Sequence, residues 1–322
     1  MIETEYQKEI TSYLDQLTLS KSPKNLYDPI DYIMSLGGKR LRPYLLLLSA
    51  KSFGADIKEV LPQAAAIELF HNFTLIHDDI MDHAPLRRGQ ETVHHKWNEN
   101  IGILSGDAMF VKAYEQLVKL KDVRYLPKVV EIFNTTALKV CEGQQYDMDF
   151  ETLEDVSIQD YLLMIRLKTA ELLGGAMQLG ALVGGADEKH QQLFYDFAIY
   201  IGIAFQLMDD LLDVYADQAK FGKQVGGDII ENKKTYLYLK LAEVISEEDV
   251  KEWDQLKVDS NNERKVKGVK ALYNKYNIDK ACKELIEQYY LKGLDCAQQW
   301  KIPSKEKELI LNFAGQLKQR DS

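Results

Sequence analysis

The chain has 322 residues, 46% of them hydrophobic and 28% charged, and its 40 basic and 50 acidic residues give a formal net charge of −10. This composition predicts a globular protein with a sizeable core and excludes a disordered or collagen-like chain. The acidic balance argues against a nucleic-acid binder held by phosphate contacts. Three scattered cysteines without a CxxC pair argue against a disulfide framework. We expect a cytoplasmic protein without a signal peptide or an integral membrane segment, since no apolar run approaches the roughly 20 residues of a membrane-spanning helix.

Apolar residues recur at helical spacing along most of the chain, which predicts an all-α fold. The spacing predicts helices over 60–83, 101–119, 124–147, 187–217, 229–243 and 279–298. Ser157 and Asp160 predict a capping box at the start of a further helix. Glycines at 174, 175, 180, 184 and 185 indicate close approach between helices, because they weaken the helix that contains them. No flexible linker or fixed-period repeat is visible, so we predict a single domain over residues 1–322.

An acidic motif, DDxxD, closes each of two apolar helices. Asp78 and Asp82 are four residues apart and share a helical face, with Asp79 on its flank. The second copy consists of Asp209, Asp210 and Asp213. One such copy is typical of a solvated helix end, but two copies favour a site for a cation that neutralises the clustered carboxylates. Oxygen ligands alone favour Mg²⁺ or Mn²⁺, with part of the coordination shell supplied by a diphosphate.

Three basic segments accompany the acidic motifs. Lys39 and Arg42 are three residues apart after a Gly-Gly turn, and Arg87 with Arg88 follows the first motif on a predicted loop. The third segment follows the second motif and contains Lys223 and Lys233. Each segment alone would be typical of a solvated surface, but together they indicate an anionic ligand, because guanidinium groups bind diphosphate oxygens in a bidentate manner.

Other polar positions have two interpretations each. Lys168, next to Thr169 in an apolar helix, either extends its charge to water or has a specific partner. His71, seven residues before Asp78, is either a hydrogen-bonded core residue or a phosphate donor. The polar stretch 142–147 is interpreted as a surface feature.

Eight motifs in order resemble those of the trans-prenyltransferases, the head-to-tail isoprenyl diphosphate synthases. The resemblance covers most of residues 35 to 240, and its motifs are GGKRLRP at 37–43, HNFTLIHDDIMD at 71–82, RRG at 87–89, Gly106-Asp107, GQQYD at 143–147, Lys168-Thr169, FQLMDDLLD at 205–213 and GKQVGGD at 222–228. It implies an all-α bundle around a deep central cavity, usually a homodimer. It also implies Mg²⁺-dependent condensation of isopentenyl diphosphate with an allylic diphosphate, through ionisation, attack by the double bond and loss of a proton to the released pyrophosphate.

The resemblance also implies roles for individual residues. The acidic motifs would hold Mg²⁺, with Asp78, Asp82 and Asp209 foremost. The allylic diphosphate would be contacted by Arg87, Lys168, Lys223 and Lys233. Isopentenyl diphosphate would be bound by Lys39, Arg42, His71 and Arg88, with Arg40 beside this site. Thr169 and Gln206 would lie near the developing carbocation.

Product length is expected to depend on Phe70, Phe73 and Thr74. A chain that grows from a diphosphate at the first motif must extend along the preceding helical turns, and Phe73 and Phe70 lie about 7.5 and 12 Å upstream at 1.5 Å per residue. The aromatic rings would limit the product, and the Phe-Thr pair looks like the arrangement in geranylgeranyl diphosphate synthases, with farnesyl diphosphate as the second candidate. The alternative is that both phenylalanines are ordinary core residues.

Three other functions stay open at this point. A class I terpene cyclase shares the first motif, although DDLLDVYAD differs from the usual second motif of cyclases. A di-iron or metal-storage bundle is suggested by ExxH at Glu68–His71 and Glu91–His94. A non-catalytic relative is the third alternative.

Overall fold

We describe residues 5–17, 22–216 and 226–318 from a computed structural model of the chain. Among these residues the fold is all-α, as predicted, apart from a short antiparallel pair of strands, β1 (Leu86–Arg87) and β2 (Gln90–Glu91). These described residues divide into two compact units: unit 1 comprises those within 1–137, 172–195 and 300–310, and unit 2 comprises those within 138–171, 196–299 and 311–322. Four of the described helices have residues in both units, namely α7 (Leu126–Thr152), α9 (Glu171–Val183), α10 (Glu188–Tyr215) and α17 (Ser304–Lys318). The single domain stays a prediction.

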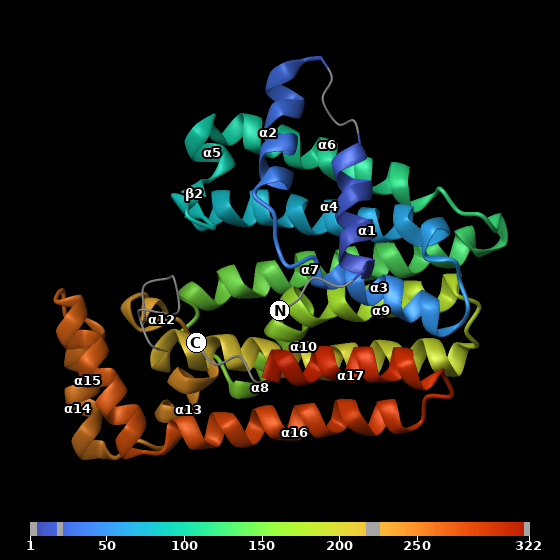
Figure 1. The fold of residues 1–322 in the computed structure, drawn as a ribbon. Helices are drawn as coiled ribbons and strands as arrows, with labels where there is room; N and C mark the ends of the chain where they lie inside the picture. The colour runs from blue at the N-terminus through green and yellow to red at the C-terminus, as the bar shows by residue number, and fades with distance from the viewer. Residues whose placement is uncertain (1–4, 18–21, 217–225, 319–322) are drawn as a thin grey trace. The chain divides into compact units, whose positions relative to one another are not determined.

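Unit 1 is built around α4 (Ile57–Met81), which lies beside α6 (Glu99–Leu117) and also packs on α3 (Leu41–Ser52) (Figure 1). Every residue of α4 from Ala64 to Phe70 is buried, so this helix forms the centre of the unit. The other elements of the unit are α1 (Glu5–Gln16), α2 (Lys24–Ser35), α5 (Val93–Lys96), the 3-10 turn η1 (Val123–Tyr125) and nearly all of α9 (Glu171–Val183).

Glycines allow the helices of unit 1 to approach closely, as predicted for α9. A Cβ atom at Gly180 would lie 2.2 Å from the carbonyl oxygen of Leu46, and one at Gly175 would lie 2.3 Å from Oγ1 of Thr136. On α6, a Cβ at Gly106 would lie 2.3 Å from the imidazole of His77. The acidic end of α4 therefore lies directly against α6.

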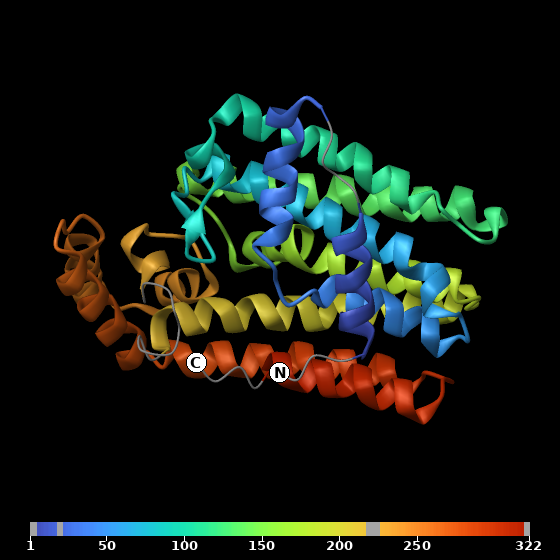
Figure 2. The ribbon, with the colours of Figure 1, turned by 45° about the horizontal axis from the view of Figure 1, so that its top comes forward.

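Unit 2 contains α8 (Ile158–Ile165), the π-helical turn η2 (Arg166–Ala170), α12 (Gly227–Ile230), α13 (Tyr236–Val244), α14 (Glu247–Lys257), α15 (Asn262–Lys275) and α16 (Ile278–Gln298). The predicted capping box is confirmed, with both reciprocal hydrogen bonds between Ser157 and Asp160 at the start of α8. Helices α14 and α15 pack as a hairpin (Figure 2).

The predicted helix over 229–243 is wrong in one respect, because the chain forms two helices there. Asn232 has a left-handed backbone with φ of 54°, and Thr235 is extended, so the segment between α12 and α13 leaves the helical path. The π-helical turn was not predicted either, since its apolar spacing resembles that of an ordinary helix. Within the described ranges, no helix is long and apolar enough to cross a membrane.

Candidate functional site

The first acidic motif lies at the C-terminal end of α4, and its three carboxylates face different surroundings. Asp79 is buried at 1% exposure, whereas Asp78 is 20% exposed and Asp82, which caps the helix, is exposed. Neighbouring residues on a helix point about 100° apart, so Asp79 faces inward while Asp78 and Asp82 share the outer face. The shared face of Asp78 and Asp82 agrees with the spacing argument.

Arg87 lies on the β1–β2 hairpin beside the motif, and its guanidinium forms an ion pair with the Asp79 carboxylate. Its Nε donates to both carboxylate oxygens at 2.8 Å, its Nη2 lies 2.7 Å from Oδ1 of Asp79, and the same Nη2 is 3.6 Å from Asp78. Burial raises the pKa of Asp79, against the hydrogen bond from Arg87. Burial alone would lower the pKa of Arg87, but the hydrogen bond and charge of Asp79 raise it above its usual range. Asp79 thus serves mainly to hold Arg87 in place.

Four arginines surround His71 in unit 1, and we call Arg40, Arg42, Arg87 and Arg88 the arginine cluster. Arg40, at the left-handed residue before α3, donates from Nη1 to Glu68 at 2.5 Å in a buried ion pair. Arg40 and Arg87 are therefore each matched by a buried carboxylate. Among the described residues, no carboxylate lies within 4.0 Å of the guanidinium nitrogens of Arg42 or Arg88 as an ion pair.

Arg42 and His71 form the inner part of the cluster. Nη1 of Arg42 donates to Nε2 of His71 at 3.1 Å, so this nitrogen is unprotonated. Burial lowers the pKa of His71 well below its usual value, and the charges of Arg42 and Arg88 lower it further. Nε of Arg42 is buried and has no hydrogen-bond partner among the described residues. A buried charged donor without a partner is costly, so this site is suited to an anion.

Arg88, whose charge acts on His71, lies against the Gly-Gly turn that precedes Lys39. A Cβ atom at Gly38 would lie 2.9 Å from Nη2 of Arg88, so the guanidinium rests against the backbone just before Lys39. The backbone oxygen of Lys39 accepts a hydrogen bond from Gln7 at 3.0 Å. The structure therefore brings together the basic residues of two sequence segments.

Aromatic side chains line α4 upstream of the motif. The ring of Phe73 stacks on Phe110 of α6 at 5.1 Å, and Phe70 lies 5.4 Å from Phe133 of α7. Phe70 is buried at 1% exposure, whereas Phe73 is half-buried. Thr74 is also half-buried, and its hydroxyl donates to the backbone oxygen of His71 at 2.8 Å. Of the two phenylalanines, Phe73 is the one that a ligand on this face of α4 could touch.

The second acidic motif lies in unit 2, and its second aspartate, Asp210, is buried like Asp79 of the first motif. Asp210 is 6% exposed and accepts hydrogen bonds from the hydroxyl of Tyr161 and from Nε2 of Gln206, the latter at 3.0 Å. Oε1 of Gln206 in turn accepts from the hydroxyl of Thr169 at 3.1 Å. Burial raises the pKa of Asp210, and the charge of Asp228 raises it further. The predicted residues Thr169 and Gln206 are thus in direct contact.

Asp213, the last residue of the second motif, contacts the backbone of Asp228 at the start of α12. Its Oδ2 accepts from the backbone N–H of Asp228 at 3.1 Å, and burial together with Asp213 raises the pKa of Asp228. Asp209 is half-buried on the same helix, and the exposed ammonium of Lys233 lies 3.7 Å from Glu231. The predicted Lys223 lies outside the described residues.

Lys168 has a specific partner, which settles its two interpretations. Its Nζ donates to Asp147 at 2.6 Å, so the stretch 142–147 is more than a surface feature. Gly143 in the same stretch lies against the π-helical turn, where an added Cβ would be 2.2 Å from the backbone nitrogen of Lys168. A lone lysine in an apolar helix was the signal for this pair, although it left open a side chain that extends to water and did not identify Asp147.

The sequence did not identify Tyr161 and Glu68 as residues that support the site. A buried tyrosine hydroxyl needs a partner, and Arg40 beside an apolar helix needs a carboxylate, so both had a general signal. Neither signal identifies the partner, because the contacts join residues 49 and 28 positions apart.

The donor set at the first motif fits a magnesium ion that is shared with a ligand. Across residues 5–17, 22–216 and 226–318, no group of three or more His, Cys, Asp or Glu side chains is arranged to hold a metal by itself. Asp78 and Asp82 supply carboxylate oxygens on one face, and Mg²⁺ is usually bound by one or two carboxylates with water and substrate phosphates. Arginines next to these carboxylates suit such a phosphate ligand.

Comparisons with known proteins agree on one family. The sequence model described as polyprenyl synthetase matches residues 23–276. A curated relative from Methanosarcina mazei, named geranylgeranyl diphosphate synthase, is 43% identical over 232 residues, which cover 71% of each chain. A solved geranylgeranyl pyrophosphate synthase is 46% identical with a TM-score of 0.93, over 98% of each chain. A polyprenyl synthase from Caulobacter crescentus, solved with calcium and isoprenyl diphosphate, is 26% identical with a TM-score of 0.86, over 98% of this chain and 96% of that one.

We predict that the Asp79–Arg87 ion pair contributes to the stability of the fold. Replacing Arg87 with Met leaves a buried carboxylate without its cation, so the free energy of unfolding should fall by about 3 kcal/mol. Arg124→Met removes an arginine that is 86% exposed in its pair with Asp122, so the free energy of unfolding of this variant should stay close to that of the wild type. Urea unfolding followed by circular dichroism measures both. Equal small losses would show that the Asp79 carboxylate does not depend on Arg87.

Proposed function

The chain belongs to the polyprenyl synthetase family, and on that premise we propose that it is a short-chain prenyltransferase that condenses isopentenyl diphosphate with allylic diphosphates and releases pyrophosphate. The observation that carries this function is the arginine cluster, in which Arg42 and Arg88 lack an ion-paired carboxylate among the described residues, next to an outward-facing pair of aspartates. Cations and metal-binding carboxylates side by side suit a diphosphate ester.

Unit 1 would bind isopentenyl diphosphate through Lys39, Arg42, His71 and Arg88. The unprotonated Nε2 of His71 already accepts from Arg42, so this imidazole orients the guanidinium. Arg40 is tied to buried Glu68, and we assign it to shaping the site rather than to direct contact. Arg87, aligned by Asp79, would contact the allylic diphosphate.

Asp78 and Asp82 would hold Mg²⁺ at the first motif, and Asp209 would do so at the second. A bound magnesium ion would neutralise charge that builds on the departing diphosphate. Asp79 and Asp210, predicted as ligands, have their carboxylates engaged by Arg87 and by Tyr161 with Gln206. Asp213 accepts a backbone hydrogen bond, so we place these three in supporting roles.

In unit 2, Lys168, aligned by Asp147, and Lys233 would also contact the diphosphate, and Lys223 is assigned the same role from its motif. Oxygens of Thr169 and Gln206 would stabilise the allylic cation that forms when the carbon–oxygen bond to diphosphate breaks. The double bond of isopentenyl diphosphate then attacks this cation, and the released pyrophosphate takes the proton that is lost. No side-chain nucleophile takes part.

Geranylgeranyl diphosphate is the product that we assign. The two most similar proteins named above are both geranylgeranyl diphosphate synthases, and Phe73 presents a half-buried ring upstream of the first motif. Phe70 lies behind it in the core, so Phe73 with Thr74 would end the cavity. Farnesyl diphosphate is the second candidate.

A homodimer is supported by an apolar stripe on α6. Leu104, Val111 and Val118 recur at seven-residue spacing along and just beyond the helix and are 59%, 60% and 47% exposed. Such a stripe suits burial against a second copy. The cytoplasmic location stays a prediction.

The alternatives lose support from the same observations. A terpene cyclase is not among the relatives named above, which are chain-elongating synthases by name. A di-iron centre at Glu68 and His71 is disfavoured, because Glu68 is ion-paired with Arg40 and His71 accepts from Arg42. A non-catalytic relative would have no need of both acidic motifs.

Replacing either leading aspartate should abolish metal-dependent turnover. Asp78→Asn or Asp209→Asn removes a charged ligand, so kcat should fall by about three orders of magnitude or more, since each 1.4 kcal/mol of lost stabilisation is tenfold. Turnover is measured from isopentenyl and allylic diphosphates across a Mg²⁺ titration, with exposed Asp187→Asn as the control. Near-normal activity of either variant, or activity in excess chelator, would contradict the metal assignment.

Arg42 should discriminate between the two substrates. Arg42→Ala removes charge-assisted hydrogen bonds of about 1.5 to 3 kcal/mol, so KM for isopentenyl diphosphate should rise by about ten- to a hundredfold. KM for the allylic substrate should change by less than about threefold. Arg124→Ala is the surface control. Equal weakening of both substrates would show that the isopentenyl site lies elsewhere.

Phe73 and Thr74 should set product length in opposite directions. Phe73→Ala opens space beyond the ring and should lengthen the main product, whereas Thr74→Phe should shorten it. Product chains are released by phosphatase and separated by chromatography, with Phe53→Leu as an aromatic control elsewhere in unit 1. If both variants stay active with the wild-type product, Phe73 and Thr74 do not form the end of the cavity.

A further inference from the structure

Four side chains of unit 2 form one chain of hydrogen bonds. Tyr161 of α8 is 2% exposed and donates to Oδ2 of Asp210. Oδ1 of Asp210 accepts from Nε2 of Gln206 at 3.0 Å, and Oε1 of Gln206 accepts from Thr169 at 3.1 Å. Tyr161 and Asp210 are buried, while Gln206 and Thr169 are half-buried. This row of hydrogen bonds therefore runs from the buried residues Tyr161 and Asp210 to the half-buried Gln206 and Thr169, which a ligand can reach.

The carboxylate at the buried end decides which way the Gln206 amide points. The Tyr161 hydroxyl donates to Oδ2, which leaves Oδ1 as the acceptor that faces Gln206, and an acceptor oxygen selects the NH₂ end of the amide. The carbonyl oxygen is then left to accept the single proton of the Thr169 hydroxyl. The carbonyl oxygen of Gln206 and the hydroxyl oxygen of Thr169 each keep a lone pair that takes no part in these hydrogen bonds.

We propose that Tyr161 is a positioning residue for prenyl transfer, which holds Asp210 so that the oxygens of Gln206 and Thr169 face the developing allylic cation. The inference rests on the proposed function, in which Gln206 and Thr169 lie beside that cation. Oxygen dipoles that are aligned before the reaction stabilise charge without having to reorganise. Tyr161 acts through Asp210 and Gln206 and does not itself touch the substrate.

The hydroxyl of Tyr161 is needed because Asp210 is buried. A buried carboxylate must keep its hydrogen-bond donors, and Tyr161 and Gln206 supply one to each of its oxygens. Without the hydroxyl, Oδ2 loses its donor and the carboxylate is free to rotate toward another one. The Gln206 amide then loses the acceptor that defines its orientation.

The test is a double-mutant cycle with Tyr161→Phe and Gln206→Leu. In Tyr161→Phe, kcat should fall about tenfold while KM for each substrate stays within about twofold. Gln206→Leu should lower kcat at least as much, and the double variant should match Gln206→Leu, because Tyr161 has no amide left to orient. Assays are run at a temperature at which circular dichroism shows every variant folded.

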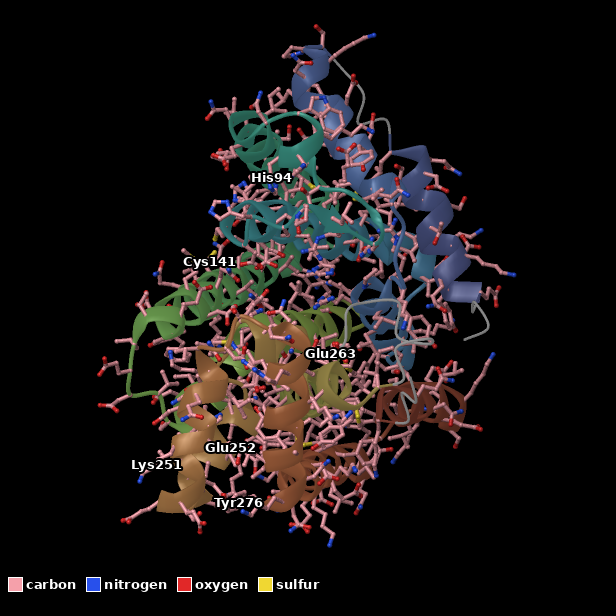
Figure 3. All side chains as sticks on the ribbon, turned by 90° about the vertical axis from the view of Figure 1, so that its left-hand side faces the viewer. His94, Cys141, Lys251, Glu252, Glu263 and Tyr276 are labelled. Atoms are coloured by element: carbon pink, nitrogen blue, oxygen red, sulfur yellow. The ribbon has the colours of Figure 1, made fainter. Side chains whose placement is uncertain are left out.

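Tyr276→Phe is the matched control. Tyr276, labelled in Figure 3 near the end of the α14–α15 hairpin, also donates to an aspartate, Oδ2 of Asp249 at 2.5 Å. Removing this hydroxyl deletes the same kind of hydrogen bond away from the Gln206 amide, so kcat should not change.

Distinct outcomes separate this inference from the function on which it rests. Wild-type kcat in Tyr161→Phe, or a double variant in which the two losses multiply, overturns the positioning role while Gln206→Leu still reports on the reaction. Absence of prenyl transfer by the wild-type protein overturns the proposed function itself.

Discussion

The candidate site depends on two buried ion pairs, Arg40 with Glu68 and Arg87 with Asp79, which leave the other two arginines of the cluster available for a ligand. Asp79 and Glu68 each neutralise one arginine of the cluster, and both carboxylates are almost fully buried. If these pairs were absent, four guanidinium groups would repel one another around an uncharged imidazole. With them, the cluster is stable in the absence of ligand yet keeps Arg42 and Arg88 for an anion, which is how an acidic chain maintains a strongly cationic site.

Both acidic motifs follow one geometric rule. The middle aspartate of each, Asp79 or Asp210, points inward and is hydrogen-bonded by the protein, whereas Asp78 and Asp209 are more accessible. The rule follows from the helix, because adjacent residues differ in direction by about 100° and cannot share a face. Each motif therefore combines a ligand-facing group with an anchor, and its conformation does not depend on the metal alone.

The sequence predicts the features that depend on local spacing and misses those that depend on the tertiary fold. The long helices, the capping box and the shared face of Asp78 and Asp82 follow from periodicity. The break between α12 and α13 depends on the left-handed residue Asn232, which apolar spacing does not reveal. Partners such as Tyr161 for Asp210 lie far apart in the chain, so their type was predictable but their identity was not.

The π-helical turn at 166–170 amounts to one residue more than a regular helix needs. Because the extra residue widens one turn, deleting it would restore an α-helix with little change in the orientation of the two flanking segments. The local surface would still change, since Lys168, which donates to Asp147, and the backbone against which Gly143 lies both belong to the widened turn. The turn therefore behaves as an inserted unit that has to be inherited or transplanted whole, together with the glycine that accommodates it.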